Sequence, residues 1–230
     1  MAKHELTRRR LLYHTLAGGG AVGASYFGFT RETSGHTLET RVAEGPKLDL
    51  GDYNWEILGD CDVHLIEWLD ENRITDAAIY HFGTGGHHHV GIECAKPERR
   101  NSVLGITAAP REYDSYVQLA IKRPEVLRYY NAVFGDIYLL NEKLLPTFDV
   151  VTLFHLCEFR SPRTAADGGL TDLQVTNVLT DRTRAGGHIL FFPGSIGFAC
   201  AKTVIAQWEK ERPVERVGEY KSLLVYRKAA

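Results

Sequence analysis

The feature that most constrains the fold of this chain is a regular alternation of short apolar runs with amphipathic segments, from residue 63 to the C-terminus. Apolar runs of strand length lie at 77–80, 102–106, 131–134, 149–154 and 187–192. Segments with helical spacing of apolar residues lie at 63–72, from 90 onward, and at 113–128, 170–179 and 199–211. Strands buried on both faces are apolar throughout, and helices connect parallel strands. The alternation therefore predicts an α/β fold, with a mostly parallel sheet, helices on both faces and right-handed crossovers.

Two further segments of strand character close the chain. They lie at 214–220 and 222–227, after a helix that we expect to end before Pro213. Their short separation predicts an antiparallel hairpin, which would complete a seven-stranded sheet. Pro124 lies inside the predicted helix at 113–128 and should interrupt its later part.

Size, charge and cysteine spacing exclude several classes of protein. A chain of 230 residues suffices for one domain with a sizeable core, and its 44% hydrophobic and 24% charged residues exclude a wholly disordered, collagen-like or polytopic membrane protein. The net charge of −2 gives no bulk attraction to nucleic acid or anionic lipid. The cysteines show no CxxC pair, which argues against an iron–sulfur or structural zinc site and leaves any disulfide pairing unspecified. They are Cys61, Cys94, Cys157 and Cys200.

The N-terminal segment combines arginines with an uncharged run. Thr7 is followed by three arginines at 8–10, and residues 11–29 contain no Lys, Arg, Asp or Glu. This pattern resembles the twin-arginine export signal, and the five glycines of the run give it the mild hydrophobicity that suits such a signal. At about 1.5 Å per residue, the run would just cross a hydrocarbon core of about 30 Å.

We therefore predict a twin-arginine-like signal or transmembrane helix at 1–29, a polar linker at 30–52 and a folded domain at 53–230. The positive charges precede the apolar run, so the N-terminus should face the cytoplasm and the domain should be membrane-associated on the periplasmic side. The alternative is a buried glycine-rich helix of a soluble fold, which would place the whole chain in the cytoplasm.

Two glycine-containing turns follow predicted strands, where parallel α/β sheets bind their ligands. The first strand leads into the sequence HFGTGG at 81–86, and the third leads into GDI at 135–137. Glycines at such turns let a ligand approach the backbone closely. A Leu-Pro pair at 145–146 precedes the fourth strand.

In this order, the motifs of residues 55–228 resemble those of the class I S-adenosyl-L-methionine (AdoMet)-dependent methyltransferases. The resemblance implies a Rossmann-like methyltransferase fold and AdoMet as the cofactor. It places Gly83 and Gly85 against the methionine and ribose portions of AdoMet. It also places the carboxylate of Asp136, with Ile137 beside it, at the adenine amino group.

The chain departs from this family at two strand ends. His81 ends the first strand, where the family has an acidic residue, and the resemblance makes His81 a candidate cofactor contact. Thr107 or Ala108 stands where the family acid holds both ribose hydroxyls. A carboxylate accepts two hydroxyl protons, whereas threonine offers one weaker neutral contact, a loss of about 1.5–3 kcal/mol. We therefore expect weak AdoMet binding that Thr107→Asp would tighten, unless Glu112 or Asp114 supplies the missing acid.

His155 and Glu158 follow the fourth strand, where the resemblance implies substrate-facing residues, and they are the candidate catalytic acid/base pair. A polar loop after a buried strand is the alternative. The three histidines at 87–89 would point about 100° apart on a helix and so could not chelate together, and we predict no metal site. The GSIG sequence at 194–197 lacks the spacing of a hydrolase nucleophile elbow, and a missing third glycine argues against a nicotinamide-dinucleotide site.

Two functions are compatible with these features. The first is AdoMet-dependent methyl transfer to a small molecule or a membrane-associated acceptor, with His155 or Glu158 as general base. The second is a membrane-anchored, catalytically silent methyltransferase-like domain that serves as an accessory or scaffold subunit of a membrane protein complex. AdoMet is a cytoplasmic cofactor, so export of the domain would favour the second function. Neither function has nucleic acid as a partner.

Overall fold

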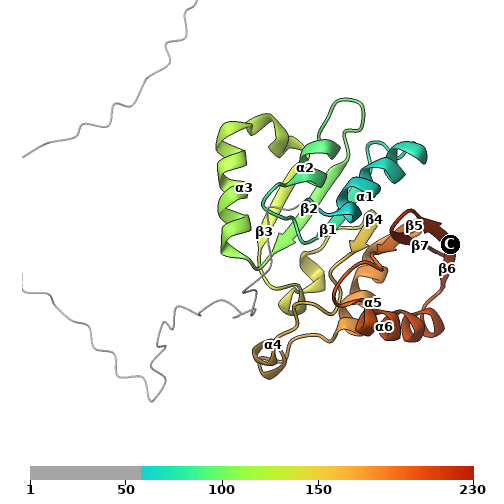
Figure 1. Ribbon diagram of the computed structural model, residues 1–230. Coiled ribbons are helices and arrows are strands. Elements are labelled where there is room, and N and C mark those ends of the chain that lie inside the picture. Colours follow the sequence, from blue (N-terminus) through green and yellow to red (C-terminus); the bar gives the residue numbers. More distant parts are fainter. Residues whose placement is uncertain (1–57) are drawn as a thin grey trace, which may run out of the picture. The chain divides into compact units, whose positions relative to one another are not determined.

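The apolar runs form one mixed sheet in the computed structural model, which describes residues 58–230 (Figure 1). The strands are β1 (Ala78–Phe82), β2 (Ser102–Thr107), β3 (Tyr130–Phe134), β4 (Phe148–Leu153), β5 (Thr183–Phe191), β6 (Val214–Tyr220) and β7 (Leu223–Lys228). Their order across the sheet is β3-β2-β1-β4-β5-β7-β6. Strands β1 to β5 run parallel, and β7 pairs antiparallel with β5 and β6. The predicted Rossmann-like sheet with a C-terminal antiparallel hairpin is confirmed.

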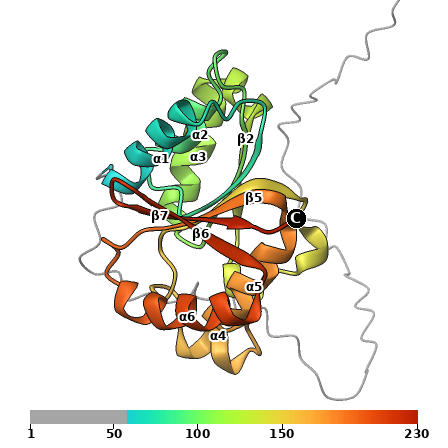
Figure 2. The same ribbon diagram turned by 90° about the vertical axis from the view of Figure 1, so that its right-hand side faces the viewer.

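Helices cover both faces of this sheet. The α-helices of the described residues are α1 (Asp60–Glu71), α2 (His89–Cys94), α3 (Pro110–Lys122), α4 (Pro162–Ala166), α5 (Asp172–Arg182) and α6 (Phe198–Glu211). Short 3-10 helices are η1 (Pro124–Arg128), η2 (Ile137–Leu139) and η3 (Glu142–Leu144). Figure 2 shows α1, α2 and α3 above the sheet and α4, α5 and α6 below it.

The sheet separates two apolar clusters. Leu179 of α5 and Trp208 of α6 pack in the cluster on one face, and Leu65 and Leu69 of α1 pack in the cluster on the other. Strand β4 is central, and residues 150–153 are all at most 1% exposed. Its continuous apolar sequence predicted burial on both faces, and that prediction is confirmed.

Differences from the predicted elements occur at boundaries and in connections. Helix α3 begins at Pro110, three residues earlier than predicted, because proline suits the first helical turn. It ends at Lys122, and Pro124 begins η1, so the expected interruption at Pro124 is confirmed. The elements α4, η2 and η3 were not predicted, because segments of five residues or fewer show no helical period.

The predicted signal or anchor at 1–29 and the linker at 30–52 lie outside the described residues. Within residues 58–230, no helix is long and apolar enough to cross a membrane. Both N-terminal segments, and the export route that they predict, stay predictions.

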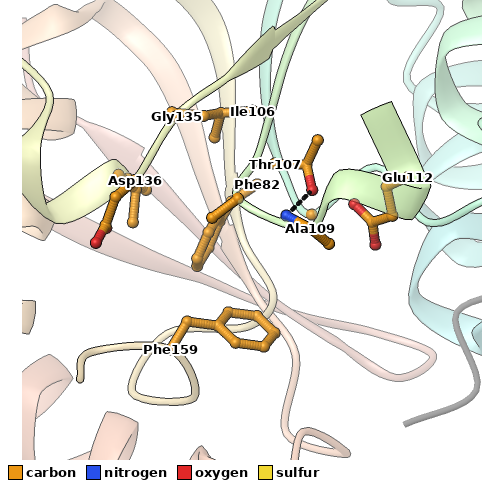
Figure 3. A pocket seen from close by; sticks show the side chains of 11 residues that line it. Phe82, Ile106, Thr107, Ala109, Glu112, Gly135, Asp136 and Phe159 are labelled. Carbon is orange, nitrogen blue, oxygen red and sulfur yellow. Dashed lines mark hydrogen bonds between the residues drawn. The ribbon is translucent and has the colours of Figure 1, made fainter. Parts of the chain in front are cut away.

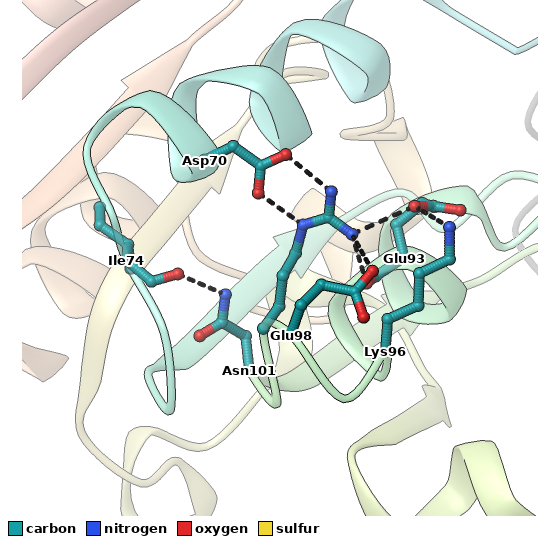
Figure 4. A network of polar contacts seen from close by, with 7 residues as sticks. Asp70, Ile74, Glu93, Lys96, Glu98 and Asn101 are labelled. Carbon is teal, nitrogen blue, oxygen red and sulfur yellow. Dashed lines mark hydrogen bonds and ion pairs between the residues drawn. The ribbon is translucent and has the colours of Figure 1, made fainter.

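Arg99 fastens α1 to the connection between α2 and β2 (Figure 4). Its guanidinium forms two hydrogen bonds of 2.7 Å with the carboxylate of Asp70, near the end of α1, and one of 3.2 Å with Glu93 of α2. Just before β2, the side chain of Asn101 donates to the backbone oxygen of Ile74 at 3.0 Å. A bidentate arginine–carboxylate pair fixes direction as well as distance. The network therefore orients α1, which carries one acid of the site described below.

A disulfide joins Cys157 to Cys200, whose Cα atoms are 6.1 Å apart. It fastens the loop after β4 to the first turn of α6. The other two cysteines, Cys61 and Cys94, are buried and free. Sequence analysis left this pairing open, because 43 residues separate the two partners and only the fold brings them together.

Removal of the disulfide should lower the free energy of unfolding by about 3–4 kcal/mol, because a cross-link over 43 residues restricts the unfolded chain. Urea denaturation of the Cys157→Ser/Cys200→Ser variant measures this loss. The wild-type protein in dithiothreitol is the matched control and should unfold at the same urea concentration as the variant. Equal stability of the oxidised and reduced wild-type protein would contradict the prediction.

Candidate functional site

Two adjoining hollows lie at the carboxyl ends of the parallel strands, where this class of sheet binds ligands. Their empty space, including the part open to solvent, is about 410 and 510 Å³. Gly83, Glu112 and Phe159 line both hollows. The two hollows are therefore neighbouring parts of one site.

The first, which we call the strand-end hollow, lies beyond β1, β2 and β3 (Figure 3). It is lined by Phe82, Gly83, Ile106, Thr107, Ala108, Ala109, Glu112, Gly135, Asp136, Ile137 and Phe159. Register brings the strand ends together, because Phe82 pairs with Ile106 in the sheet. In Figure 3, Phe82 and Phe159 lie between Asp136 on one side and Glu112 on the other. The hollow therefore has apolar walls between two carboxyl groups.

The carboxylate of Asp136 is held by its own turn and by α4. Its Oδ1 accepts a hydrogen bond from the backbone N–H of Tyr138 at 2.8 Å, and its Oδ2 accepts one from the hydroxyl of Thr164 at 2.9 Å. A carboxylate has about four acceptor positions, so further positions remain for a ligand. Ile137 follows in the lining of the hollow. The adenine contact predicted for Asp136 needs one acceptor position, and it stays a prediction.

Thr107 ends β2 and lines the hollow, as the sequence placed it, and its hydroxyl oxygen is engaged within the chain. The Oγ1 of Thr107 accepts a hydrogen bond from the backbone N–H of Ala109 at 3.0 Å. This bond shapes the turn into α3. The connection between β2 and α3 in turn brings Glu112, in the first helical turn of α3, to the same hollow.

Glu112 is the buried acid of this end of the site. Its side chain is 1% exposed, and its Oε2 accepts a hydrogen bond from the hydroxyl of Thr84 at 3.1 Å. Its Oε1 is buried and has no hydrogen-bond partner among the described residues. Burial raises the pKa of this carboxyl, against hydrogen bonds from Thr107 and Thr84 that lower it. An unpaired buried acceptor costs about 1–3 kcal/mol, so Oε1 marks a position for a donor from a ligand.

The second hollow, which we call the acid–histidine chamber, lies over the glycine turn after β1. Its lining consists of Gly59, Cys61, Asp62, Gly83, Gly85, His87, Glu112, His155, Phe159 and Phe192. Its acids come from helices, Asp62 from α1 and Glu112 from α3. Its histidines come from loops, His87 from the turn before α2 and His155 from the loop after β4.

Asp62 is 6% exposed and lies between two histidines. Its Oδ1 is 3.5 Å from Nε2 of His81, and its Oδ2 is 3.6 Å from Nε2 of His87. Burial raises the pKa of Asp62 to about 7, against the charge of His155, which lowers it. The carboxyl of Asp62 therefore gains its charge as the pH rises through neutrality.

His81 lies behind the chamber, outside the linings of both hollows. Its Nδ1 is 2.9 Å from the hydroxyl of Thr152 in β4, and burial lowers the pKa of His81 to about 3, so the ring is neutral. The cofactor contact predicted for His81 stays a prediction. Asp62, next to it, stands near the end of β1, where the resemblance implies an acidic residue.

Gly83 and Gly85 adopt left-handed backbone conformations, with φ of 83° and 57°. A Cβ atom on Gly83 would lie 2.8 Å from Cδ2 of His155, and one on Gly85 would lie 2.4 Å from Nε2 of His87. Glycine is therefore required at both positions. Each imidazole ring therefore lies where a Cβ atom of its glycine would be.

His155 and Glu158, the predicted acid/base pair, are in contact. Nδ1 of His155 is 3.0 Å from Oε2 of Glu158, whose other oxygen accepts a hydrogen bond from the hydroxyl of Ser195. Burial would lower the pKa of His155, but the hydrogen bond and charge of Glu158 outweigh burial and raise it. Conversely, burial would raise the pKa of Glu158, and these hydrogen bonds lower it. His155 lines the chamber while Glu158 orients it from behind.

The consecutive histidines make separate contacts. His87 lies beside Asp62, whereas His88 is buried, with Nδ1 2.9 Å from the hydroxyl of Tyr130 and Nε2 2.7 Å from that of Ser115. Within residues 58–230, one group has the spacing of metal ligands, and two of its members form the disulfide. That group is Cys157, Asp172 and Cys200.

Sequence analysis did not identify several lining residues, among them Asp62, Phe159 and Phe192. Asp62 had a detectable signal, because it precedes the buried Leu65 and Ile66 by three and four residues on the apolar stripe of α1. A charged residue on such a stripe is unusual and points to a special role. Phe159 and Phe192 had no signal, because loop conformation decides where they point.

No family model matches the sequence, and no curated protein matches it. Solved structures match the fold. The N-methyltransferase NodS from Bradyrhizobium japonicum WM9, in complex with S-adenosyl-L-homocysteine, has a TM-score of 0.53 at 13% identity, over 82% of this chain and 95% of that chain. The precorrin-6y C5,15-methyltransferase from Geobacter metallireducens GS-15 has a TM-score of 0.50 at 15% identity, over 76% of this chain and 92% of that chain.

The 4+2 cyclase SpnF has a TM-score of 0.52 at 11% identity, over 74% of this chain and 82% of that chain. Identities this low establish a fold and leave the activity open, and the cyclase shows that the fold is not confined to proteins named as methyltransferases. The domain described here has the Rossmann-like fold of the class I AdoMet-dependent methyltransferases.

Proposed function

We propose that this protein is an AdoMet-dependent methyltransferase that acts on a small-molecule acceptor. The observation that carries the proposal is the strand-end hollow, with apolar walls between Asp136 on one side and Glu112 on the other. A nucleoside has the matching pattern, because its base has apolar faces and an amino donor, and its ribose has hydroxyl donors. The shared fold supports the same cofactor.

The residues of the strand-end hollow fit the adenosine half of AdoMet. Asp136 keeps acceptor positions for the adenine amino group, and the unpaired Oε1 of Glu112 needs a donor such as a ribose hydroxyl. Phe82 and Phe159 supply apolar contact for the base. When bound, AdoMet would supply an activated methyl group. The adjoining chamber would take the rest of the cofactor and the acceptor.

His155 is the residue of the chamber that is best prepared to take a proton. Glu158 holds its Nδ1 and raises its pKa, so the ring is a stronger base than an isolated buried histidine. An acceptor that loses an O–H or N–H proton on methylation would pass that proton to His155. Phe159 and Phe192 border the chamber and would exclude water from the acceptor.

Asp136→Asn should weaken AdoMet binding by about tenfold to a hundredfold, because it removes a charge-assisted bond of about 1.5–3 kcal/mol. Calorimetric titration with AdoMet measures the dissociation constant. Thr164→Val is the matched control, since it removes the internal bond to Asp136 but keeps the carboxylate, and it should bind nearly as well as the wild type. An unchanged dissociation constant in Asp136→Asn would contradict the assignment of Asp136 to the adenine amino group.

Glu112→Gln should weaken AdoMet binding by about tenfold to a hundredfold, because the amide removes the charge and one acceptor at the ribose end. Thr107→Asp should weaken binding too, because its new carboxylate would lie beside buried Glu112. This is the sign that the sequence predicts for the case in which Glu112 supplies the acid that the end of β2 lacks. Asp114→Asn, on the exposed side of α3, is the control. Tighter binding by Thr107→Asp would refute the assignment of Glu112.

A second candidate function is that of a membrane-anchored, catalytically silent domain in a membrane protein complex. Two observations favour it. The disulfide between Cys157 and Cys200 suits an oxidising compartment outside the cytoplasm. The histidine rings over Gly83 and Gly85 occupy the space above the glycine turn. A domain beyond the membrane would meet AdoMet only if the cofactor were carried out bound.

Residues 1–40 should direct a fused reporter out of the cytoplasm, because three arginines precede an uncharged run. The test uses two fusions, one to a reporter active only outside the cytoplasm and one to a reporter active only inside it. Replacement of Arg8 and Arg9 by lysine is the control and should abolish export through a twin-arginine route. Activity of the inside reporter alone would contradict export and leave the silent domain without a route across the membrane.

A further inference from the structure

The turn between β5 and α6 supports the acid–histidine chamber from behind. It carries the GSIG sequence at 194–197, which the proposed function does not use. A Cβ atom on Gly194 would lie 2.4 Å from Cζ of Phe192, so glycine makes room for this ring, which lines the chamber. A Cβ atom on Gly197 would lie 2.9 Å from Cγ of Glu158. The two glycines therefore let the turn lie close to the chamber wall and to the loop after β4.

Ser195 connects this turn to the loop after β4. Its hydroxyl donates a hydrogen bond to Oε1 of Glu158, because a carboxylate can only accept. Its Oγ accepts a hydrogen bond from the backbone N–H of Gly197 at 3.1 Å. The hydroxyl therefore has one partner for its proton and one for its oxygen, which fixes its orientation. Ser195 lines neither hollow, so it would not touch a ligand bound in them.

Glu158 is held at both carboxylate oxygens. Oε1 accepts from Ser195, and Oε2 is 3.0 Å from Nδ1 of His155. Burial would raise the pKa of Glu158, whereas hydrogen bonds from His155, Ser195 and the backbone of Gly197 lower it, so the group is a carboxylate. Its side chain is 2% exposed. Water therefore does not readily replace the Ser195 hydroxyl as a donor to Oε1.

A carboxylate at Nδ1 decides which nitrogen of His155 carries the proton of the neutral ring. One nitrogen of a neutral imidazole donates and the other accepts, and the carboxylate of Glu158 only accepts. The proton therefore lies on Nδ1, and Nε2 is the basic atom. A Cβ atom on Gly83 would lie 2.8 Å from Cδ2 and 3.4 Å from Nε2 of His155, so this edge of the ring faces the glycine turn. Glu158 thereby directs the basic atom toward the chamber.

We infer that Ser195 is a positioning residue of this site. Its hydroxyl holds the carboxylate of Glu158, and the carboxylate keeps the proton of neutral His155 on Nδ1, with the basic Nε2 on the chamber side. The use of Nε2 as the proton acceptor in methyl transfer rests on the proposed function, whereas the placement of the ring proton does not.

Other titratable groups also act on the charge of His155. Glu158 on the same loop, Asp62 on α1 and Glu112 on α3 raise its pKa through their negative charges, and His81 on β1 faces it too. These groups change their own charge with pH, so the pKa of His155 does not isolate the contribution of the turn at 194–197. The tautomer of the neutral ring is the better measurement, because it reports the hydrogen bond at Nδ1 directly.

The experiment measures the ring nitrogen NMR shifts of His155 in the full chain, at a pH at which the ring is neutral. The wild-type protein should show the tautomer with the proton on Nδ1. Ser195→Ala should lower the ratio of this tautomer to the Nε2–H tautomer by about tenfold, because Glu158 loses the donor that orients it. Ser195→Thr keeps the hydroxyl and should restore the wild-type ratio.

Two further measurements separate positioning from a general loss of structure. The pKa of Glu158, followed through its carboxyl carbon shift, should rise in Ser195→Ala and return in Ser195→Thr, since a hydrogen bond to the carboxylate is lost and regained. Ile196→Ala is the matched control, because Ile196 lies in the same turn and its side chain is 82% exposed. This variant should match the wild type in the tautomer of His155 and in the pKa of Glu158.

The outcomes test the two proposals separately. An Nε2–H tautomer in the wild-type protein overturns the inference without any variant, and so does an unchanged tautomer in folded Ser195→Ala. If either result comes from a chain that binds AdoMet in a calorimetric titration, the methyltransferase proposal stands while the role of Ser195 is wrong. If the tautomer changes as expected and the wild-type chain does not bind AdoMet, the role of Ser195 stands and the methyltransferase proposal is wrong.

Discussion

The turn after β1 is the constraint on which both hollows depend. Gly83 and Gly85 adopt left-handed conformations that residues with a Cβ atom rarely adopt, and their lack of side chains lets the rings of His155 and His87 lie against the backbone. The turn thereby gathers the loop after β4 and the segment before α2 at one edge of the sheet. A side chain at either glycine would displace a histidine, and with it a wall of the chamber.

The two buried acids stand on helices rather than on strand ends, and the helices give a physical reason. Asp62 and Glu112 both lie in the first turn of their helices, α1 and α3, where unpaired backbone N–H groups favour negative charge. At the end of β1, by contrast, the neutral ring of His81 bonds to Thr152 between two strands, an enclosed position in which a carboxylate would be costly. The helix termini therefore partly replace the lysines and arginines that both linings lack within the described residues.

Much of the fold was predictable from sequence, because burial leaves a pattern in the chain. The run at 149–154 predicted β4, observed at Phe148–Leu153, since a strand covered on both faces must be apolar throughout. The site was harder to predict from the sequence. Gly83, Thr107 and Asp136 could be located because they lie at the ends of predicted strands or just after them. The position of Glu112 depends on the turn after β2, which Thr107 shapes, and this turn brings Glu112 near the strand end that lacks an acidic residue. The pairing of Cys157 with Cys200 depends on the loop after β4 meeting α6, which no local pattern specifies.

The loop after β4 carries both the disulfide, which favours an oxidising compartment, and His155, which lies beside the glycine turn where AdoMet would bind. It is anchored by the disulfide of Cys157, by the hydrogen bond from the backbone N–H of Cys157 to Asp172 at 2.9 Å, and by the contact of Glu158 with Ser195. These anchors fix the backbone that carries His155, whose ring lies where a Cβ atom of Gly83 would be. In a reducing compartment the disulfide would be absent, and only the hydrogen bonds would hold the loop. The bond that favours a place outside the cytoplasm therefore also fastens the group that covers the glycine turn, so the state of one disulfide bears on both candidate functions.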